Sequence, residues 1–283
     1  MTLVKLRSGV TLEIEISGTA GAPLMVLVPG AGAPLDFWHP SYVDALIESG
    51  FRVLRFNHRD TGLSDHFDEA YSIDVLISEM WELIDRFEAG TVHLTGHSMG
   101  SYMGVISMLD KRHRLSSVTA ISAGPTTDQS RYSELRMIPP DPSTWGVLIE
   151  NTPSGNLSAD LTGWMKSWRF LNGDVEFDQE HALAYTKALY RGDPRNAQVA
   201  VNHVHAMTTL RADLSDRLAG TKTPLLVLHG EKDPLVPLSH GQALQRIVPE
   251  AQISVLNSAG HMFFNGHVWK NIVAVQTAFI EGL

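Results

Sequence analysis

The chain has 283 residues, of which 43% are hydrophobic and 19% charged, and its formal net charge is -9. These values describe an ordinary globular protein, long enough for one α/β domain that carries an insertion. The negative charge argues against nucleic acid or an anionic membrane as the main partner. The absence of cysteine excludes disulfides, thiolate nucleophiles and cysteine-ligated metals.

The N-terminal residues 1–16 alternate between apolar and polar side chains and lack the apolar run of a signal peptide. No stretch of the chain approaches the roughly 20 apolar residues of a membrane span. We therefore expect a cytoplasmic protein whose partner is a small molecule and not a membrane.

Up to residue 121 the pattern alternates between strands and helices. The expected elements are a strand pair within Val4–Ile16, a strand at Leu24–Val28, a helix at Tyr42–Glu48, a strand at Phe51–Phe56, a helix at Ile73–Phe87 with Ser72 as its N-cap, a strand at Val92–Thr95, a helix through Tyr102–Met108 and a strand at Ser117–Ile121. Such alternation predicts an α/β fold with a doubly wound, mostly parallel sheet.

The alternation stops at Gly124 and resumes at Pro224. The stretch between them is helix-like and rich in aromatic residues, which predicts an inserted helical cap over the carboxyl edge of the sheet. Beyond it we expect a strand at Leu225–Leu228, a helix at Gly241–Ile247, a strand at Ile253–Leu256 and a helix at Val268–Ile280. The predicted organisation is therefore a core of residues 1–124 and 224–283, with a cap of residues 125–223.

Ser98 lies at the centre of the stretch VHLTGHSMGSYMGVIS, between a strand and a helix. A chain that turns from strand to helix within five residues must hold its middle residue in a tight bend. Glycines two positions before and after Ser98 suit this bend, because strand and helix pass too closely there for a side chain. The pattern is that of a nucleophile elbow, Gly-x-Ser-x-Gly.

A serine hydroxyl needs a base to remove its proton, usually a histidine that a carboxylate orients. Three loops that follow three predicted strands offer Ser98, Asp233 and His261, and these loops can meet at one edge of the sheet. Asp128, which follows the strand before the insertion, is a weaker alternative to Asp233.

The chain resembles the α/β-hydrolase superfamily over nearly all residues outside the cap. The resemblance rests on GHSMG, on PLLVLHGEKDPLVP and on ISVLNSAGH, and the loop HRDTGLSD is similar to that of bacterial esterases of the aclacinomycin methylesterase type. It implies that Ser98 is the nucleophile, His261 the general base and Asp233 the residue that orients the imidazole.

The resemblance also implies an oxyanion hole made of two main-chain N–H groups. One belongs to Met99, and the other to the loop after Leu24–Val28, where Ala31 is the expected donor and Gly32 the alternative. Many relatives have His-Gly at this point, whereas this chain has Pro-Gly-Ala-Gly. Without the histidine, we expect a small and flexible loop.

Trp38, Trp145 and Trp164 are the expected substrate-binding residues, since aromatic side chains near the loops suit an apolar substrate. His203 and His205 do not form a metal site, because side chains two positions apart on a helix point in different directions. We expect no metal and no cofactor, and the oligomeric state stays open, a homodimer included. The predicted function is hydrolysis of a small apolar ester or lactone by a serine hydrolase; the alternatives are a carbon–carbon bond hydrolase with the same triad and a non-catalytic small-molecule receptor.

Overall fold

The computed structural model describes residues 1–87, 90–192 and 200–283. Its described residues form one eight-stranded sheet. The strands are β1 (Thr2–Lys5), β2 (Thr11–Ser17), β3 (Leu24–Val28), β4 (Arg52–Phe56), β5 (Val92–His97), β6 (Leu115–Ile121), β7 (Leu225–Gly230) and β8 (Gln252–Leu256).

The strand order across the sheet is β1-β2-β4-β3-β5-β6-β7-β8. β1, β2 and β4 pair antiparallel, and every pair from β4 through β8 is parallel. The predicted doubly wound, mostly parallel sheet is thus confirmed. Because parallel strands end at the same edge, the loops after β3, β5, β7 and β8 gather there.

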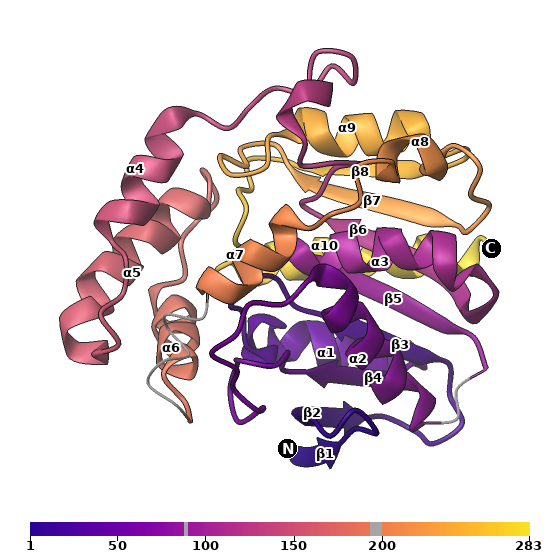
Figure 1. The fold of residues 1–283 in the computed structure, drawn as a ribbon, viewed down its shortest axis with the longest axis horizontal. Coiled ribbons are helices and arrows are strands. Elements are labelled where there is room, and N and C mark those ends of the chain that lie inside the picture. The colour runs from indigo at the N-terminus through magenta and orange to yellow at the C-terminus, as the bar shows by residue number, and fades with distance from the viewer. Residues whose placement is uncertain (88–89, 193–199) are drawn as a thin grey trace.

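Helices cover both faces of the sheet (Figure 1). They are α1 (Pro40–Glu48), α2 (Ile73–Asp85), α3 (Met99–Asp110), α4 (Pro142–Glu150), α5 (Leu157–Leu171), α6 (Gln179–Leu189), α7 (Ala200–Thr208), α8 (Leu214–Leu218), α9 (Leu238–Ile247) and α10 (Gly266–Glu281). Side chains of α1 and α10 belong to one buried cluster, and those of α2, α3, α8 and α9 belong to another. The two clusters are the two halves of the core.

The predicted strands and helices lie where their apolar patterns placed them, with small differences at the ends. Leu24–Val28 is buried at every position, as a strand covered on both faces must be. Ser72 is the N-cap residue of α2, but its side chain makes no capping hydrogen bond. α9 begins at Leu238, three residues before the predicted start.

The helical insertion (residues 125–223) lies between β6 and β7 in the chain. In Figure 1, α4, α5 and α6 form a separate layer beyond the left side of the sheet. The insertion is nevertheless buried against both halves of the core. Leu214 of α8 and Ala206 of α7 lie in the same cluster as α2 and α3, and Trp168 of α5 and Tyr185 of α6 lie in the same cluster as α1 and α10. Helices α5 to α8 of the insertion therefore pack against the core, and the division into core and cap stays a prediction.

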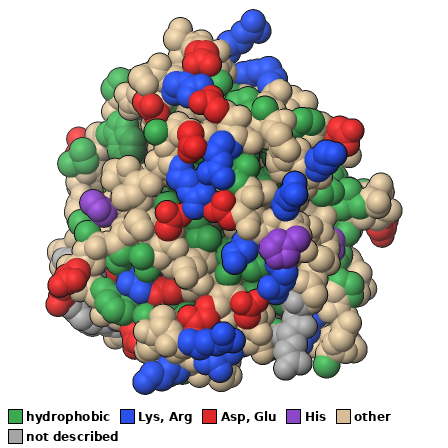
Figure 2. Space-filling view, turned by 45° about the vertical axis from the view of Figure 1, so that its right-hand side comes forward, with side chains coloured by type: hydrophobic (Ala, Val, Ile, Leu, Met, Phe, Trp, Pro, Cys, Tyr) green, Lys and Arg blue, Asp and Glu red, His purple; other side chains and the backbone are tan. Residues whose placement is uncertain are grey.

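Acidic and basic side chains intermingle on the face shown in Figure 2, without a large patch of one sign. Within the described residues, no helix combines the length and the apolarity of a membrane span.

Candidate active site

Ser98 lies between the end of β5 and the start of α3 with φ 50° and ψ -118°. This left-handed backbone is strained for a residue other than glycine. The glycines on either side permit the bend: a Cβ on Gly96 would lie 2.3 Å from the carbonyl carbon of Gly100, and a Cβ on Gly100 would lie 2.1 Å from the Val28 oxygen. The close packing of β5, α3 and β3 at the predicted elbow therefore requires glycine at both positions.

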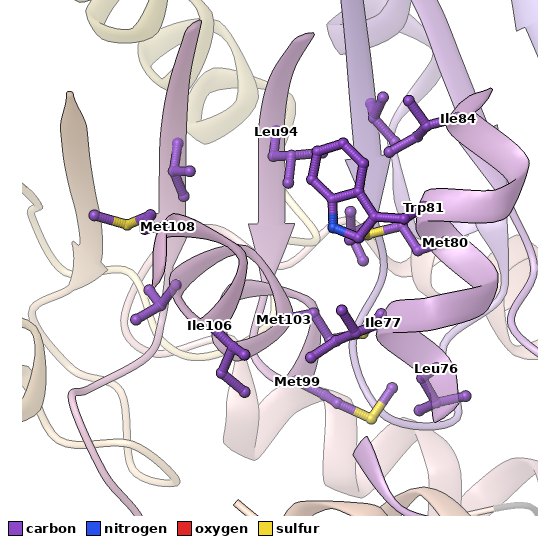
Figure 3. Close-up of a cluster of buried hydrophobic side chains, with 14 of the residues drawn as sticks. Leu76, Ile77, Met80, Trp81, Ile84, Leu94, Met99, Met103, Ile106 and Met108 are labelled. Carbon is purple, nitrogen blue, oxygen red and sulfur yellow. The ribbon is translucent and has the colours of Figure 1, made fainter. Parts of the chain in front are cut away.

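Met99, the residue after the elbow, anchors the start of α3. Its side chain is buried against α2, near Leu76 and Ile77 (Figure 3). Further along the same interface, Trp81 Nε1 donates a hydrogen bond to Ser107 Oγ at 3.0 Å. Within the described part of the chain, the main-chain N–H of Met99 donates to no protein acceptor. It is free to bind an oxygen beside Ser98.

Asp233 and His261 meet in the loops after β7 and β8. The Nδ1–H of His261 donates to Asp233 Oδ2 at 2.8 Å. The other carboxylate oxygen, Oδ1, accepts from the N–H groups of Leu235 and Val236 at 2.9 and 2.8 Å. Burial alone would raise the pKa of Asp233, but its interactions with His261 hold that pKa below its usual value. Asp233 therefore stays ionised and leaves Nε2 of His261 as a hydrogen-bond acceptor.

The helical insertion holds the main chain around His261. The carbonyl oxygen of Leu171, at the end of α5, accepts from His261 N at 2.7 Å and from Met262 N at 3.0 Å. A β-bridge joins Gly173 to Ala259. The histidine thus lies between a carboxylate of the core and the end of a helix of the insertion.

His97 connects this histidine to the elbow. Its Nε2–H donates to the His261 carbonyl oxygen at 2.8 Å, and its ring stacks on Phe37 with centroids 4.3 Å apart. Because His97 directly precedes Ser98, the contact brings the elbow and His261 to the same place. Among the hydrogen bonds of the described residues, none joins the Ser98 hydroxyl to His261.

The donor loop (residues 29–33) follows β3 and packs against the elbow. A Cβ added to Gly30 would lie 3.3 Å from Ser98 Cβ, so glycine permits the approach. The loop is anchored from outside: Pro29 O accepts from His58 Nε2–H at 3.2 Å, and Gly32 N–H donates to His203 Nδ1 at 2.7 Å. The expectation of a flexible loop is therefore wrong, since side chains from other segments supply the missing support.

The donor loop leaves one of its two candidate donors unengaged. Gly32 N–H is occupied by His203, whereas the N–H of Ala31, within the described residues, has no protein acceptor. Ala31 is also exposed. These observations favour Ala31 over Gly32 as the second donor.

Sequence reasoning missed the part that His203 plays. The sequence pattern raises only the question of metal binding for this residue. Among the described residues there is no group of three or more possible metal ligands. No local signal could have revealed the contact, because Gly32 is 171 positions away in the chain.

The three predicted tryptophans lie in different environments. Trp38 is 0% exposed and packs against Tyr42 and Trp269 in the core, so its assignment as a pocket wall is wrong. Trp164 is half-buried, stacks on Trp168 at 4.6 Å and donates to Tyr190 Oη at 2.8 Å. Trp145 of α4 is 51% exposed. The substrate-binding role of Trp145 and Trp164 stays a prediction.

Asp128, the alternative acid, is exposed and accepts a hydrogen bond from Ser130 N at 2.9 Å, capping a 3₁₀ turn. Asp233, and not Asp128, is the carboxylate in contact with His261.

A strained serine, an imidazole oriented by a carboxylate, and the N–H groups of Met99 and Ala31, which have no protein acceptor among the described residues, lie at one edge of a parallel sheet. This combination is typical of one class of proteins. Residues 23–267 match the family model of the alpha/beta hydrolase fold, and the chain belongs to this family. The rhodomycin D methylesterase DauP of Streptomyces sp. (strain C5) is 28% identical over 269 residues, which cover 89% of both chains. The 3-oxoadipate enol-lactonase 1 of Acinetobacter baylyi is 23% identical and covers 98% of this chain and 96% of its own length.

Among solved structures, the esterase RhEst1 from Rhodococcus sp. ECU1013 superimposes with a TM-score of 0.81 at 16% identity, covering 100% of this chain and 98% of its own. This likeness supports the fold. The relatives with related sequences support a hydrolase that acts on ester-like substrates and resembles the aclacinomycin methylesterase type.

Proposed function

We propose that this protein is a serine hydrolase that cleaves a small, largely apolar carboxylic ester or lactone through an acyl-enzyme intermediate. The observation that carries the proposal is the hydrogen bond of 2.8 Å between Asp233 Oδ2 and His261 Nδ1–H, beside a serine held at φ 50°. Together with the donor loop, these groups supply a nucleophile, a base and two oxyanion donors.

The reaction begins when Nε2 of His261 accepts the proton of the Ser98 hydroxyl while Oγ attacks the substrate carbonyl carbon. Ionised Asp233 holds Nδ1–H, so that Nε2 faces the serine, and it stabilises the imidazolium that forms. The carbonyl oxygen gains negative charge and accepts hydrogen bonds from the N–H groups of Met99 and Ala31.

The first half of the reaction ends with the acyl-enzyme. The imidazolium gives its proton to the leaving alkoxide as the bond from that oxygen to the carbonyl carbon breaks, and an ester of Ser98 remains. The second half repeats these steps with water. Water then loses a proton to His261 and attacks this ester, and the carboxylic acid leaves as Ser98 recovers its proton. A lactone follows the same path, with acid and alcohol released as one molecule.

An apolar substrate is favoured by the aromatic residues of the helical insertion, which we propose acts as a cap. Trp164 and Trp145 are the proposed contacts for the acyl or alcohol group. The sequence relatives that are named as a methylesterase and an enol-lactonase support attack on the carbonyl carbon of a carbon–oxygen ester bond.

The test is hydrolysis of p-nitrophenyl esters with acyl chains of increasing length, by the wild-type protein and by Ser98→Ala. We expect turnover that depends on Ser98, together with covalent labelling of Ser98 by a fluorophosphonate. Labelling without ester turnover would indicate a different scissile bond, such as carbon–carbon. The absence of both would contradict a serine hydrolase and favour a receptor.

A further inference from the structure

The donor loop has no polar side chain of its own, and only Ala33 belongs to a buried cluster. Its residues are Pro29, Gly30, Ala31, Gly32 and Ala33, and Gly32 adopts the left-handed φ of 66°. One main-chain hydrogen bond lies within the loop, from Ala33 N–H to Gly30 O at 3.2 Å. The orientation of its N–H groups therefore depends on contacts with other segments.

His203 on α7 contacts Gly32, the residue that follows the proposed donor Ala31. Its ring is fully buried, its Nδ1 accepts from Gly32 N–H at 2.7 Å, and its Nε2–H donates to Arg59 O at 3.1 Å. These two bonds require the neutral tautomer with hydrogen on Nε2. Burial lowers the pKa of His203 to about 4, so the ring stays neutral and keeps its acceptor at neutral pH.

The surroundings of His203 favour this state. His58 and Tyr71 contact its ring at right-angled or tilted geometry, with centroids 5.7 and 6.2 Å away. Two charged groups lie nearby, Arg59, which disfavours a charged His203, and Asp60, which favours it. His58 itself donates to Pro29 O. Two imidazoles, one from the core and one from the insertion, thus hold the two ends of the donor loop.

We propose that His203 is a positioning residue for the oxyanion hole, with a role that rests on the proposed ester hydrolysis. His203 accepts a hydrogen bond from Gly32 N–H and so orients the peptide group that follows Ala31. In this orientation the N–H groups of Ala31 and Met99 both point toward Ser98. The helical insertion therefore takes part in transition-state stabilisation through one buried side chain, in addition to covering the substrate.

Two substitutions separate the two hydrogen bonds of the ring. Asn in His203→Asn can place its Oδ1 near the position of Nδ1 and keep an acceptor for Gly32. Gln in His203→Gln can place its Nε2 near the position of the ring Nε2 and keep a donor for Arg59 O, but it offers no acceptor to Gly32. If His203 had a purely structural role, each variant would lose activity only in proportion to its loss of stability.

The measurements are kcat and KM for p-nitrophenyl butyrate, the inhibition constant of an alkyl trifluoromethyl ketone, and the melting temperature. The ketone forms a tetrahedral adduct with serine whose oxygen occupies the oxyanion hole. We expect H203Q to lower kcat about 10- to 100-fold and to change KM by no more than about threefold. The inhibition constant should rise by a similar factor as kcat falls, because a misplaced donor stabilises the transition state less. H203N should keep both within about fivefold of wild type.

Several outcomes would overturn the proposal. These are equal losses in H203N and H203Q, unchanged inhibition in H203Q, and an H203N variant that is inactive or does not fold. His205→Gln is the matched control, because His205 is exposed on the same helix and should leave kcat and inhibition unchanged. Failure of the proposed function itself would look different, since the wild-type protein would then neither hydrolyse the ester nor be labelled at Ser98.

Discussion

His97 and His261 are joined by a hydrogen bond from the side chain of the first to the main chain of the second. His97 Nε2–H donates to the His261 carbonyl oxygen over 2.8 Å, and the ring centroids are 4.9 Å apart. Burial lowers the pKa of His97 to about 3, so the donor ring is neutral. The residue before the proposed nucleophile thus fixes the distance to the proposed base.

Loss of this bond should weaken catalysis more than substrate binding. A neutral hydrogen bond contributes about 1 kcal/mol, which corresponds to about a fivefold change in rate. We expect His97→Leu to lower kcat about five- to tenfold with little change in KM. His97→Gln, whose Nε2 can occupy the place of the ring Nε2, should stay within about twofold. Steady-state kinetics with a p-nitrophenyl ester compare the variants, and equal losses in both would show that the bond is unimportant.

Replacement of Asp233 by Asn should abolish most activity while preserving the loop. The Asn Oδ1 can still accept from Leu235 and Val236, but its amide group would donate to Nδ1 of His261 and force the tautomer with hydrogen on Nε2. That nitrogen could then no longer accept the serine proton. We expect kcat to fall by about 10⁴, as for other triads of this kind.

Asp128→Asn is the control for Asp233→Asn, since Asp128 is the exposed alternative carboxylate and its replacement should leave kcat unchanged. Stopped assays at several pH values measure both variants. A large loss in the Asp128 variant would reverse the assignment of the acid.

Gly100→Ala should destabilise the protein and displace the elbow. The new Cβ would lie 2.1 Å from Val28 O and 2.8 Å from Pro29 O, both main-chain atoms that cannot rotate away. Overpacking of this kind costs about 1–3 kcal/mol, and activity should fall beyond the loss of folded protein. Urea unfolding of the variant measures the change in the free energy of unfolding.

Gly146→Ala is the matched control, because it lies in α4 with no atom within 4 Å of a new Cβ. Alanine in a helix is favoured over glycine by about 0.5–1 kcal/mol, so this variant should be slightly more stable. Equal stability of the two variants would contradict the close packing of α3 on β3.

Acid should destabilise the protein steeply through its buried histidines. Burial lowers the pKa of His58 and His97 to about 3 and that of His203 to about 4, whereas an unfolded histidine has a pKa of about 6.5. At a pH between 6.5 and 4, these three histidines bind protons in the unfolded chain that they do not bind in the folded chain. The free energy of unfolding should fall with falling pH, and these three groups alone contribute about 4 kcal/mol per unit near pH 5.

Urea unfolding at pH 7.5, 6 and 5 tests this slope. His203→Asn removes one of these groups and should reduce the slope by about 1.4 kcal/mol per pH unit. A stability that stays constant from pH 7 to 5 would contradict the neutral, buried state of these rings.

Local patterns predicted the sheet and the site residues that lie on it. The run Leu24–Val28 is apolar because it is covered on both faces, and the glycines around Ser98 reflect contacts within a few residues of the elbow. Asp233 and His261 could be paired because strand order brings their loops to one edge. Each of these signals is carried by residues close together in sequence or by the rule that parallel strands share an edge.

The anchors of the donor loop could not be predicted in this way. His58 and His203 lie far from the loop in sequence, and a buried histidine leaves no periodic pattern. The prediction that Trp38 lines the pocket was wrong for a related reason. Its position after the donor loop indicated that it lies near the site, but the packing of α1 against α10 determines that its ring points into the core.

The bridge between Gly173 and Ala259 ties the end of α5 to the loop that carries His261. Four main-chain hydrogen bonds join residues 171–174 to residues 258–262, and a movement that lifted the end of α5 from the sheet would break them and carry His261 away from Asp233. The end of α5 therefore cannot move away from the sheet while His261, the proposed base, stays in contact with Asp233. For the proposed hydrolysis we therefore expect substrate and product to pass another side of the insertion, where mutations should change the rate of exchange without changing the contact between His261 and Asp233.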